Sequence, residues 1–491
     1  MPSLQLDCDC CKVDLNYNFY SFRKLSHQTY HQSRPTSRLI IASALISGVL
    51  WLLSSYRHYL LQSNAYDLGI FDQFLWLHSK GIDTYSSLFE VHMLADHGAF
   101  ILLLLSLIYK IIPGPSALFA IQGLALSFTA LPLWTLAKIE GARDSQAWLV
   151  CITWWLTPVL FNGNLFDFHP ELIALPILGY IFLSLKQQNI LRVLILSLLC
   201  LLTRDGMVLV TLGISLSLLI KRKYLGSGLL LIISSSWLLF LVKYLYPTLG
   251  KKDFIHAASR YSYLGSSIPE LAQNLWMRPL DLLSTTLPGD NILYLLILFI
   301  PFVFLMRRSD KSILIGSFPL IISNLLSSNF SQKTLIHHYS LPAVLIILVS
   351  TVNHKNFLSF GKGFSSKKHL VCIGLCWCLL AKPGFFIDSY RSRVHMIDDF
   401  SMAKQLIFND DKVITNSYLA PHLTHREDVI FPSPDGDILH MLNKHNIILL
   451  NPLEAGWGSD TTIQKKLLDT AKLENWNCKL VGETLNLCRK N

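Results

Sequence analysis

Residues 39–56 read LIIASALISGVLWLLSSY, an apolar stretch long enough to cross a bilayer as a helix. The residues before it are polar and basic over a length too great for the first part of a cleavable signal peptide, so we expect the stretch to remain as a membrane anchor. Composition extends this prediction to the whole chain, because 52% of its residues are hydrophobic, 15% are charged and the mean hydropathy is +0.41. The sequence therefore predicts an integral membrane protein.

Further apolar segments recur along the chain and stop at residue 386. They lie at 116–138, 146–162, 171–185, 190–203, 206–220, 226–246, 291–306, 312–326, 338–353 and 368–386. Several are short for a membrane span, which local thinning of the bilayer can accommodate. Together with 39–56 they predict a mainly α fold, a polytopic bundle of about eleven membrane helices.

Segment 99–112 is barely long enough to cross the membrane and ends at Pro113-Gly-Pro115. If it lies in the outer interface, the loops assigned to the cytoplasm hold basic clusters at 23–38, 138–143, 186, 221–223, 307–311 and 355–368, a consistent positive-inside pattern. If it crosses, the basic clusters that follow it move outside while the N-terminal tail stays inside. We therefore predict an interfacial helix, a cytoplasmic N-terminus and an outer C-terminus in the plasma (inner) membrane.

The same pattern divides the chain into three parts. Residues 1–38 form a polar cytoplasmic tail, and 39–386 form the transmembrane domain with two long outer loops at 57–115 and 247–290. In residues 387–491 short apolar runs alternate with helical patterns, which predicts a small outer α/β domain. The net charge of +10 does not predict nucleic-acid binding, because most lysines and arginines lie in short loops between spans.

Carboxylates just beyond the first span indicate a functional site, since desolvating them is costly. Asp67 and Asp72 lie in Tyr66-Asp-Leu-Gly-Ile-Phe-Asp-Gln73, and Asp96-His97 follow in the same loop. Asp67 precedes the helical run and is nearest the bilayer, whereas Asp72 begins a helix that it could equally cap. Asp67, Asp96 and His97 together could hold a divalent ion such as Mg²⁺ or Mn²⁺. Alternatively, Asp96 caps a helix beside an interfacial histidine.

The other outer loops contain further candidates for substrate binding. They are Asp167, His169, Glu171, Arg204, Asp205, Arg260, His337 and His338. Arg204 and Arg260 could clamp a phosphate, because a guanidinium matches its geometry. Structural alternatives remain open: the acids could cap helices, Arg204 could pair with Asp205, and the histidines could belong to an interfacial aromatic belt.

Two sets of cysteines have informative positions. Cys8-x-x-Cys11 is followed by His27-x-x-x-His31, a spacing in the range of zinc sites, although a disordered tail is the alternative. Cys478 and Cys488 flank a predicted hairpin on the outer side of the membrane, where the two thiols could form a disulfide.

The motif at 66–73 is followed by Trp76, Gly81, Asp96-His97, Gln122 and Pro132. This pattern resembles a large family of predicted multi-spanning membrane proteins of unknown function within the GT-C glycosyltransferase superfamily. Asp167-Phe-His-Pro-Glu171, Asp205 and His338-Tyr339 extend the resemblance over nearly the whole chain.

The resemblance implies roles for particular residues. Asp67 would be the essential acid of the first outer loop, with Asp96 and His97 as a second polar position and Asp167 as a further acid. The basic residue that precedes an acid in such proteins would be Arg204. The resemblance also implies a GT-C-like bundle and a donor sugar carried on a polyprenyl phosphate or diphosphate.

These expectations describe a membrane glycosyltransferase that transfers a sugar from a polyprenyl-phosphate-linked donor to a glycan, lipid or protein acceptor. Membrane lipid would surround it, and the reaction would take place at the outer face. Asp67 would accept the proton of the acceptor hydroxyl, and Arg204, Arg260 or a metal would stabilise the departing phosphate. The alternatives are a transporter of a small or lipid-linked solute and a non-catalytic membrane scaffold or sensor. Transport is disfavoured because the sequence shows no inverted repeat and its acids cluster at one face.

Overall fold

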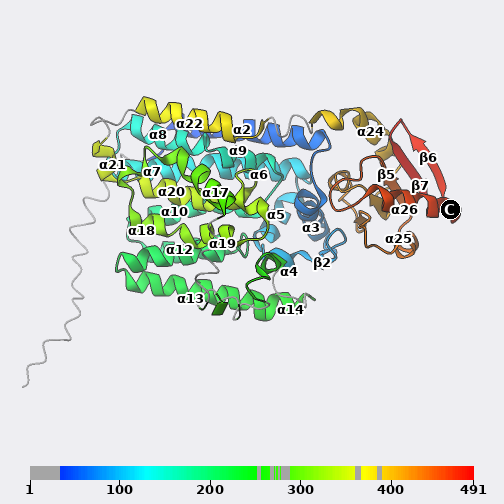
Figure 1. Cartoon of the computed structure of the whole chain (residues 1–491), viewed down its shortest axis with the longest axis horizontal. Coiled ribbons are helices and arrows are strands. Elements are labelled where there is room, and N and C mark those ends of the chain that lie inside the picture. Colours follow the sequence, from blue (N-terminus) through cyan, green and yellow to red (C-terminus); the bar gives the residue numbers. More distant parts are fainter. Residues whose placement is uncertain are drawn as a thin grey trace, which may run out of the picture.

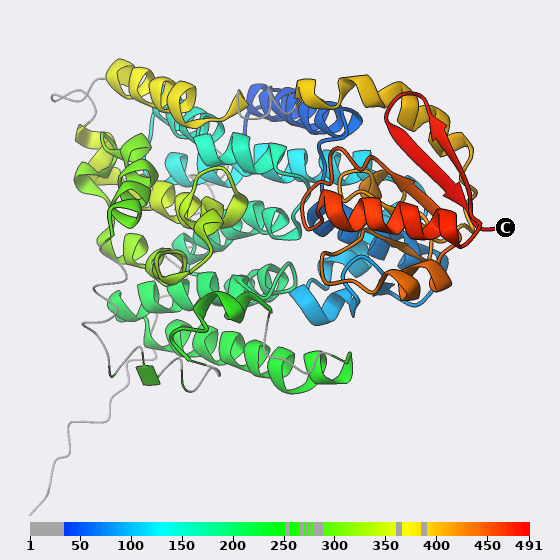
Figure 2. The same ribbon diagram turned by 45° about the vertical axis from the view of Figure 1, so that its right-hand side comes forward.

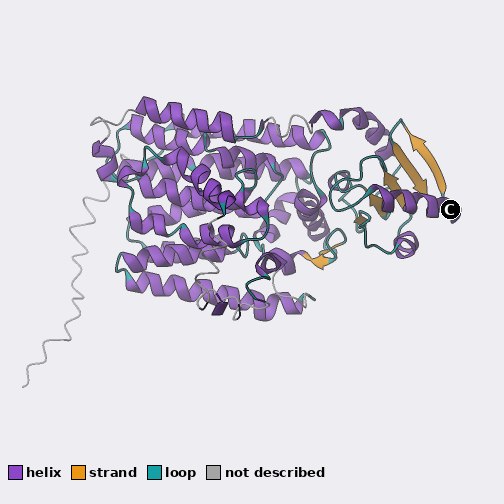
Figure 3. Cartoon of the chain, viewed as in Figure 1, coloured by secondary structure: helices purple, strands orange, loops and turns teal. Residues whose placement is uncertain are grey.

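The computed structural model describes residues 34–250, 256–265, 288–359, 366–383 and 390–491, together with positions 270, 273, 274 and 277. Long helices run side by side through most of this chain, and the main sheet lies at one end of the helical bundle (Figures 1 and 3). The prediction of a mainly α bundle with a small sheet-containing region at the C-terminus is confirmed. The zinc set proposed at Cys8, Cys11, His27 and His31 lies outside the described residues, as does most of loop 247–290.

The first helix, α2 (Ser37–Tyr59), begins where Thr36 accepts a hydrogen bond from a first-turn amide at 3.2 Å. Its buried face is rich in serine, and small residues let membrane helices approach closely. The approach is close against α6 (Pro115–Phe128), where a β-carbon added at Gly123 would lie 3.0 Å from the Ser47 carbonyl oxygen. The opposite face of α2 exposes leucine, isoleucine and valine, as a lipid-facing helix does.

The remaining helices of the bundle are shorter than α2. They are α7 (Ala130–Ile139), α8 (Asp144–Trp155), α9 (Pro158–Leu165), α10 (Ala174–Lys186), α11 (Ile190–Leu201), α12 (Met207–Ile220), α13 (Tyr224–Phe240), α14 (Tyr246–Thr248), α17 (Gly289–Phe299), α18 (Lys311–Ile315), α19 (Phe318–Leu326), α20 (Leu341–Thr351), α21 (His354–Ser359) and α22 (Ser366–Leu380). Short 3₁₀ or π turns connect them, at η2 (Pro170–Ile173), η3 (Leu241–Leu245), η4 (His256–Tyr261), η5 (Ile300–Phe302), η6 (Met306–Arg308), η7 (Phe330–Lys333) and η8 (His338–Ser340).

Three helical stretches of the described residues are long and apolar enough to span a bilayer. They are Ser37–Tyr59, Pro115–Ile139 and Tyr224–Thr248. Shorter apolar helices accompany them, and a count of about eleven spans stays a prediction because it depends on how these shorter helices meet the bilayer.

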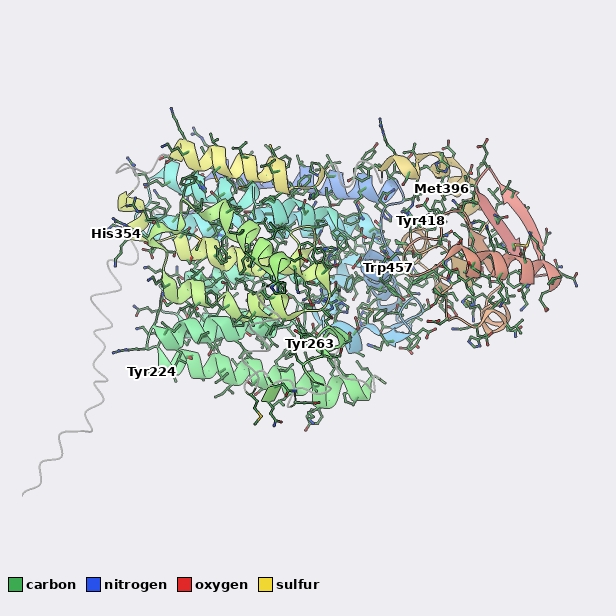
Figure 4. All side chains as sticks on the ribbon, in the orientation of Figure 1. Tyr224, Tyr263, His354, Met396, Tyr418 and Trp457 are labelled. Carbon is green, nitrogen blue, oxygen red and sulfur yellow. A yellow bond between two sulfur atoms is a disulfide. The ribbon has the colours of Figure 1, made fainter. Side chains whose placement is uncertain are left out.

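Contacts of the basic loops are found at the end of the bundle opposite the sheet. Lys186 pairs with Glu140, and the Glu140 carboxylate accepts a hydrogen bond from the amide of His354 at 3.1 Å. Figure 4 shows His354 at this end and Trp457 at the other. The bundle thus separates its basic loops from its acidic and histidine-rich loops, as expected where one end faces the cytoplasm.

Between α2 and α6 the chain forms short elements at the end that carries the sheet. They are η1 (Ala65–Gly69), α3 (Ile70–Lys80), β1 (Tyr85–Ser86), β2 (Val91–His92), α4 (Met93–His97) and α5 (Ile101–Tyr109). At the start of α5 the amide of Ile101 donates to the Leu202 carbonyl at 2.9 Å, and at its end Tyr109 packs in one core with Leu419 of the C-terminal domain. Both ends of α5 therefore lie at the same end of the bundle, as a helix lying in the interface would.

The C-terminal domain contains a five-stranded sheet in the order β4-β3-β5-β7-β6. Its strands are β3 (Val413–Thr415), β4 (Val429–Ile430), β5 (Ile447–Leu450), β6 (Asn477–Val481) and β7 (Leu485–Arg489). Strands β4, β3 and β5 are parallel, and β7 is antiparallel to both β5 and β6. The accompanying helices are η9 (Val394–Met396), α24 (Ile397–Gln405), η10 (Ala420–His422), α25 (Ile438–Lys444) and α26 (Thr461–Leu473), and Figure 2 brings this domain forward.

The hairpin of β6 and β7 is closed by a disulfide between Cys478 and Cys488, whose Cα atoms are 4.0 Å apart. The two cysteines therefore pair, which the sequence left open. The hairpin turn has Gly482 at φ +62°, and a β-carbon there would collide with the Asp399 carboxylate. That carboxylate accepts from the amide of Thr484 at 3.0 Å, so α24 holds the turn in place.

The two faces of the sheet pack against different hydrophobic cores, because successive residues of a strand point to opposite sides. Ile414 and Ile448 face a core formed with α25 and α26. Val413 and Leu449 face a second core that also contains Leu68, which belongs to the first loop of the bundle. The C-terminal domain is therefore packed on that loop through a shared hydrophobic core.

We expect the end of the bundle opposite the sheet to face the cytoplasm. A cysteine placed at exposed Ser145, in a variant without other free cysteines, should resist an impermeant maleimide applied from outside. A cysteine at exposed Lys412 of the C-terminal domain should react. Labelling of position 145 from outside alone would overturn this orientation.

Candidate active site

The site begins at η1, a π-helical turn just after α2. Asn64 initiates the turn by accepting a hydrogen bond from the Tyr66 amide at 3.2 Å, and its carbonyl accepts from the Gly69 amide at 3.1 Å. A β-carbon at Gly69 would lie 3.1 Å from Leu88, so glycine permits a close approach there. Single π turns often occur at functional sites. This one presents the Asp67 side chain, which keeps about 28% of its surface exposed.

Asp67 faces a group of histidines. The His169 Nε2 atom lies 3.4 Å from Asp67 Oδ1, and the His169 ring stacks on His338 with centroids 3.7 Å apart. Burial alone would raise the pKa of Asp67, but the hydrogen bond and charge of His169, helped by His338 and His337, lower it below its usual value. Burial lowers the pKa of His337 to about 4. At neutral pH Asp67 is therefore an ionised, partly exposed carboxylate.

Asp167 positions this turn rather than facing solvent. Its Oδ1 accepts from Arg57 Nη1 at 2.5 Å, and its Oδ2 accepts from the Asn64 amide at 2.9 Å. The residue has a left-handed φ of +78°, a costly conformation that these contacts maintain. Gln122 binds the Asp167 carbonyl at 3.0 Å and accepts from the His169 amide at 2.9 Å. One buried group of bonds thus fixes both η1 and His169.

Arg204 lies in a second network beside the histidines. Its Nη1 donates to Glu171, and its Nε is 3.9 Å from Asp205 Oδ1. His338 Nε2 is 2.7 Å from the same Glu171 oxygen. Asp205 also accepts a hydrogen bond from Tyr246 at 3.1 Å. Two carboxylates therefore already balance the charge of Arg204.

Asp96 and His97 pair with each other and lie beside Asp205, whose amide donates to the His97 carbonyl at 2.9 Å. The electrostatic partners of Asp67 are His169, His337 and His338, so the three ligands suggested by the sequence belong to two neighbouring groups. In the part of the chain that the structure describes, no three His, Cys, Asp or Glu side chains are arranged to hold a metal ion. The divalent-ion site suggested at Asp67, Asp96 and His97 stays a prediction.

Arg260 contacts Tyr339, the residue that follows His338. Its guanidinium lies over the Tyr339 ring, 5.3 Å from the centroid, and Nη2 donates to the Tyr339 hydroxyl at 3.4 Å. The positive charge of Arg260 acts on His337. The His337 ring packs edge-on against Phe166, with the two ring centroids 4.2 Å apart. Among the described residues no carboxylate pairs with Arg260, in contrast to Arg204.

Asp72 lies elsewhere, and its predicted catalytic role finds no support in this geometry. Its side chain is only 1% exposed and accepts hydrogen bonds from the hydroxyls of Tyr109 and Thr424. His425 Nε2 lies 3.3 Å from it. Through Asp72, Tyr109 therefore ties α3 to α5, and Thr424 and His425 tie α3 to the C-terminal domain.

Sequence reasoning gave no role to Arg57, Gln122 or Tyr339. Arg57 looked like a basic residue that ends a membrane helix, and only the fold brings it to Asp167, 110 residues later. Gln122 and Tyr339 were present in the family pattern, but nothing in the sequence indicated what they contact. The polar Gln122 within an apolar span was the one available signal, because a buried amide needs partners.

The fold resembles that of a solved membrane protein structure. ArnT from Cupriavidus metallidurans bound to undecaprenyl phosphate has a TM-score of 0.55 at 10% identity, covering 92% of this chain and 98% of that chain. The same protein in the apo state gives 0.44 at 10% identity, covering 91% and 97%. No curated protein sequence matches the chain. Identity this low shows a shared fold alone.

The family is established independently by sequence. The chain belongs to the family described as "Predicted membrane protein (DUF2079)", whose model matches residues 57–485. The matched range begins at Arg57 and includes every residue of the candidate site. The resemblance predicted from the sequence is confirmed, and the chain is an integral membrane protein.

Asp72 and Thr424 should matter for stability rather than for chemistry. Asp72→Asn and Thr424→Val each disturb a buried charged hydrogen bond, so we expect losses on the order of 1–3 kcal/mol and a lower thermal midpoint. Asp469→Asn is a matched control, because its carboxylate is 73% exposed and contacts only Lys472 at 3.8 Å among the described residues. A stable Asp72→Asn protein without activity would instead make Asp72 catalytic.

Proposed function

We propose that the protein is a GT-C-type glycosyltransferase that moves a sugar from a polyprenyl-phosphate-linked donor to an acceptor hydroxyl. The observation that carries the proposal is Asp67: an ionised and partly exposed carboxylate, bound to His169, at the end of the first span. The fold shared with ArnT supports the donor class, because that structure holds undecaprenyl phosphate. The sheet-bearing end of the bundle would face outside the plasma membrane.

Asp67 would act as the general base. As the acceptor oxygen attacks the anomeric carbon, its proton passes to the carboxylate, and direct displacement inverts the anomeric centre. His169 orients the carboxylate at 3.4 Å, while Asp167 and Arg57 fix the turn that carries it. A base whose rotamer is held by neighbours loses little entropy on reaching the reactive geometry.

Arg260 is the better of the two candidate phosphate clamps. The departing polyprenyl phosphate needs positive charge, and Arg260, which pairs with no carboxylate of the described residues, can supply it. Arg204 is already paired with Glu171 and Asp205, so its charge mainly compensates those buried acids. We therefore assign Arg260 to the phosphate and Arg204 to support of the histidine stack.

Transport is the second candidate, and the placement of charge argues against it. A transporter site formed by broken helices lies near the middle of the membrane. Here the Asp67 and Arg204 groups gather at one end of the bundle with the C-terminal domain (Figure 1). The acceptor would be a glycan, lipid or protein whose hydroxyl reaches this end.

Replacing the base should abolish most turnover. For Asp67→Asn we expect sugar transfer from membrane-supplied polyprenyl-phosphate sugars to fall by about a hundredfold or more, with an unchanged thermal midpoint. Because the pKa of Asp67 is lowered, the wild-type carboxylate should stay ionised at a lower pH than a free aspartate does. Exposed Asp83→Asn in the same loop is the control. Normal transfer by a folded Asp67→Asn protein would refute the assignment.

Replacing Arg260 should affect donor binding, whereas replacing Arg204 should affect stability. Arg260→Gln should raise the KM for donor about tenfold and leave stability unchanged, because no described carboxylate depends on it. Arg204→Gln should lower stability by about 3–5 kcal/mol, because the buried Glu171 loses its partner. Thermal unfolding and donor titration of both variants measure this. The reverse pattern would transfer the phosphate role to Arg204.

A further inference from the structure

A cavity of about 300 Å³ lies between the bundle and the C-terminal domain, away from Asp67. The outer turns of α2 and the start of α6 form one wall, and α24 and η10 form the other. Tyr59, Phe119 and Phe400 make most of its surface apolar. None of the groups assigned to sugar transfer lines it.

Two of the residues that line this cavity have a polar atom without a partner among the described residues. The Nε2 atom of His422 and the hydroxyl of Ser55 are buried and have no hydrogen-bond partner in the described chain. The His422 ring stacks on His58 at 3.9 Å, and His58 is in turn bound to Ser63 at 3.0 Å. Buried donors without partners are costly, so a ligand with acceptor oxygens would be stabilised here.

Lys404 supplies the charge. It lines the cavity from α24, and no ion pair of Lys404 is found among the described residues. Burial and the nearby Arg426 lower the pKa of Lys404, and Asp72 opposes them. An anion bound beside the ammonium group would favour its charged form. The cavity therefore combines apolar walls, two polar atoms without partners and a lysine that forms no ion pair with a described residue.

Exposed apolar side chains occur on the elements that line the cavity. Leu52 and Tyr56 are exposed on α2, Met402 is exposed on α24 and Leu406 is exposed directly after it. Figures 1 and 2 both show α24 beyond the end of α2 on the same side of the bundle. Exposed tyrosine next to leucine and a lysine is typical of the level where lipid headgroups lie.

We propose that this cavity binds an anionic glycerophospholipid. The phosphate would accept hydrogen bonds from Lys404, His422 and Ser55. The acyl chain would lie along the exposed face of α2. Such a lipid would fasten the C-terminal domain to the first span, because the cavity takes residues from both. This site is separate from the glycosyl-transfer chemistry and does not depend on it.

Native mass spectrometry of the full-length protein tests the proposal with phosphatidylglycerol and phosphatidylcholine as probes. The wild type should retain phosphatidylglycerol in preference to phosphatidylcholine. Lys404→Gln should lower its affinity roughly fivefold, since one lysine near an anionic headgroup has an effect of this size. Ser401→Phe, which fills the cavity without removing a charge, should lower it as well. Exposed Lys412→Gln is the matched control and should bind like the wild type.

Competition experiments show whether the bound phosphate group belongs to a glycerophospholipid, to inorganic phosphate or to undecaprenyl phosphate. Inorganic phosphate and undecaprenyl phosphate, at the same concentration, should displace phosphatidylglycerol poorly. Efficient displacement by either, or equal retention of the two phospholipids, would overturn the proposal, as would unchanged affinity in both cavity variants. Asp67→Asn should retain the lipid, and Lys404→Gln should retain sugar transfer. The failure of one proposal is therefore distinguishable from the failure of the other.

Discussion

The ion pair of Arg57 with Asp167 is the interaction on which the site depends. It joins the last turn of α2 to the loop after α9, and the same carboxylate holds the Asn64 amide that begins η1. The pair is almost fully buried, so water cannot solvate either charge if its partner is removed. Because the loop after Asp167 also carries His169, both Asp67 and the histidine beside it are fixed by one contact between two helix ends.

Features that depend on neighbouring residues could be predicted from the sequence. Helix α2 follows from an unbroken apolar stretch, and the exposed carboxylate at Asp67 follows from its place just beyond that stretch. The family resemblance is confirmed by the match over residues 57–485. Cys478 and Cys488 lie opposite each other on adjacent strands of one hairpin, a relation that the short interval between them already indicated.

Features that depend on distant residues could not be predicted. Asp72 carries the same carboxyl group as Asp67, and its contacts with Tyr109 of α5 and with Thr424 and His425 of the C-terminal domain distinguish its surroundings. Arg204 and Arg260 are equally basic in the sequence, but packing brings Glu171 to the first and an aromatic ring to the second. Composition gives the type of charge, whereas the tertiary fold decides whether that charge is already neutralised.

The shared core between the first loop and the C-terminal domain has a consequence for biosynthesis. The Gln73 side chain donates to the carbonyl of Arg426, which lies 353 residues later in the sequence. Forming this contact therefore closes a very long loop of the chain. The segment bearing Asp67 emerges early and stays incomplete until almost all of the protein has been synthesised and inserted. A nascent or truncated chain therefore lacks the part of the shared core that the C-terminal domain supplies, and the loop that bears Asp67 gains its cover last.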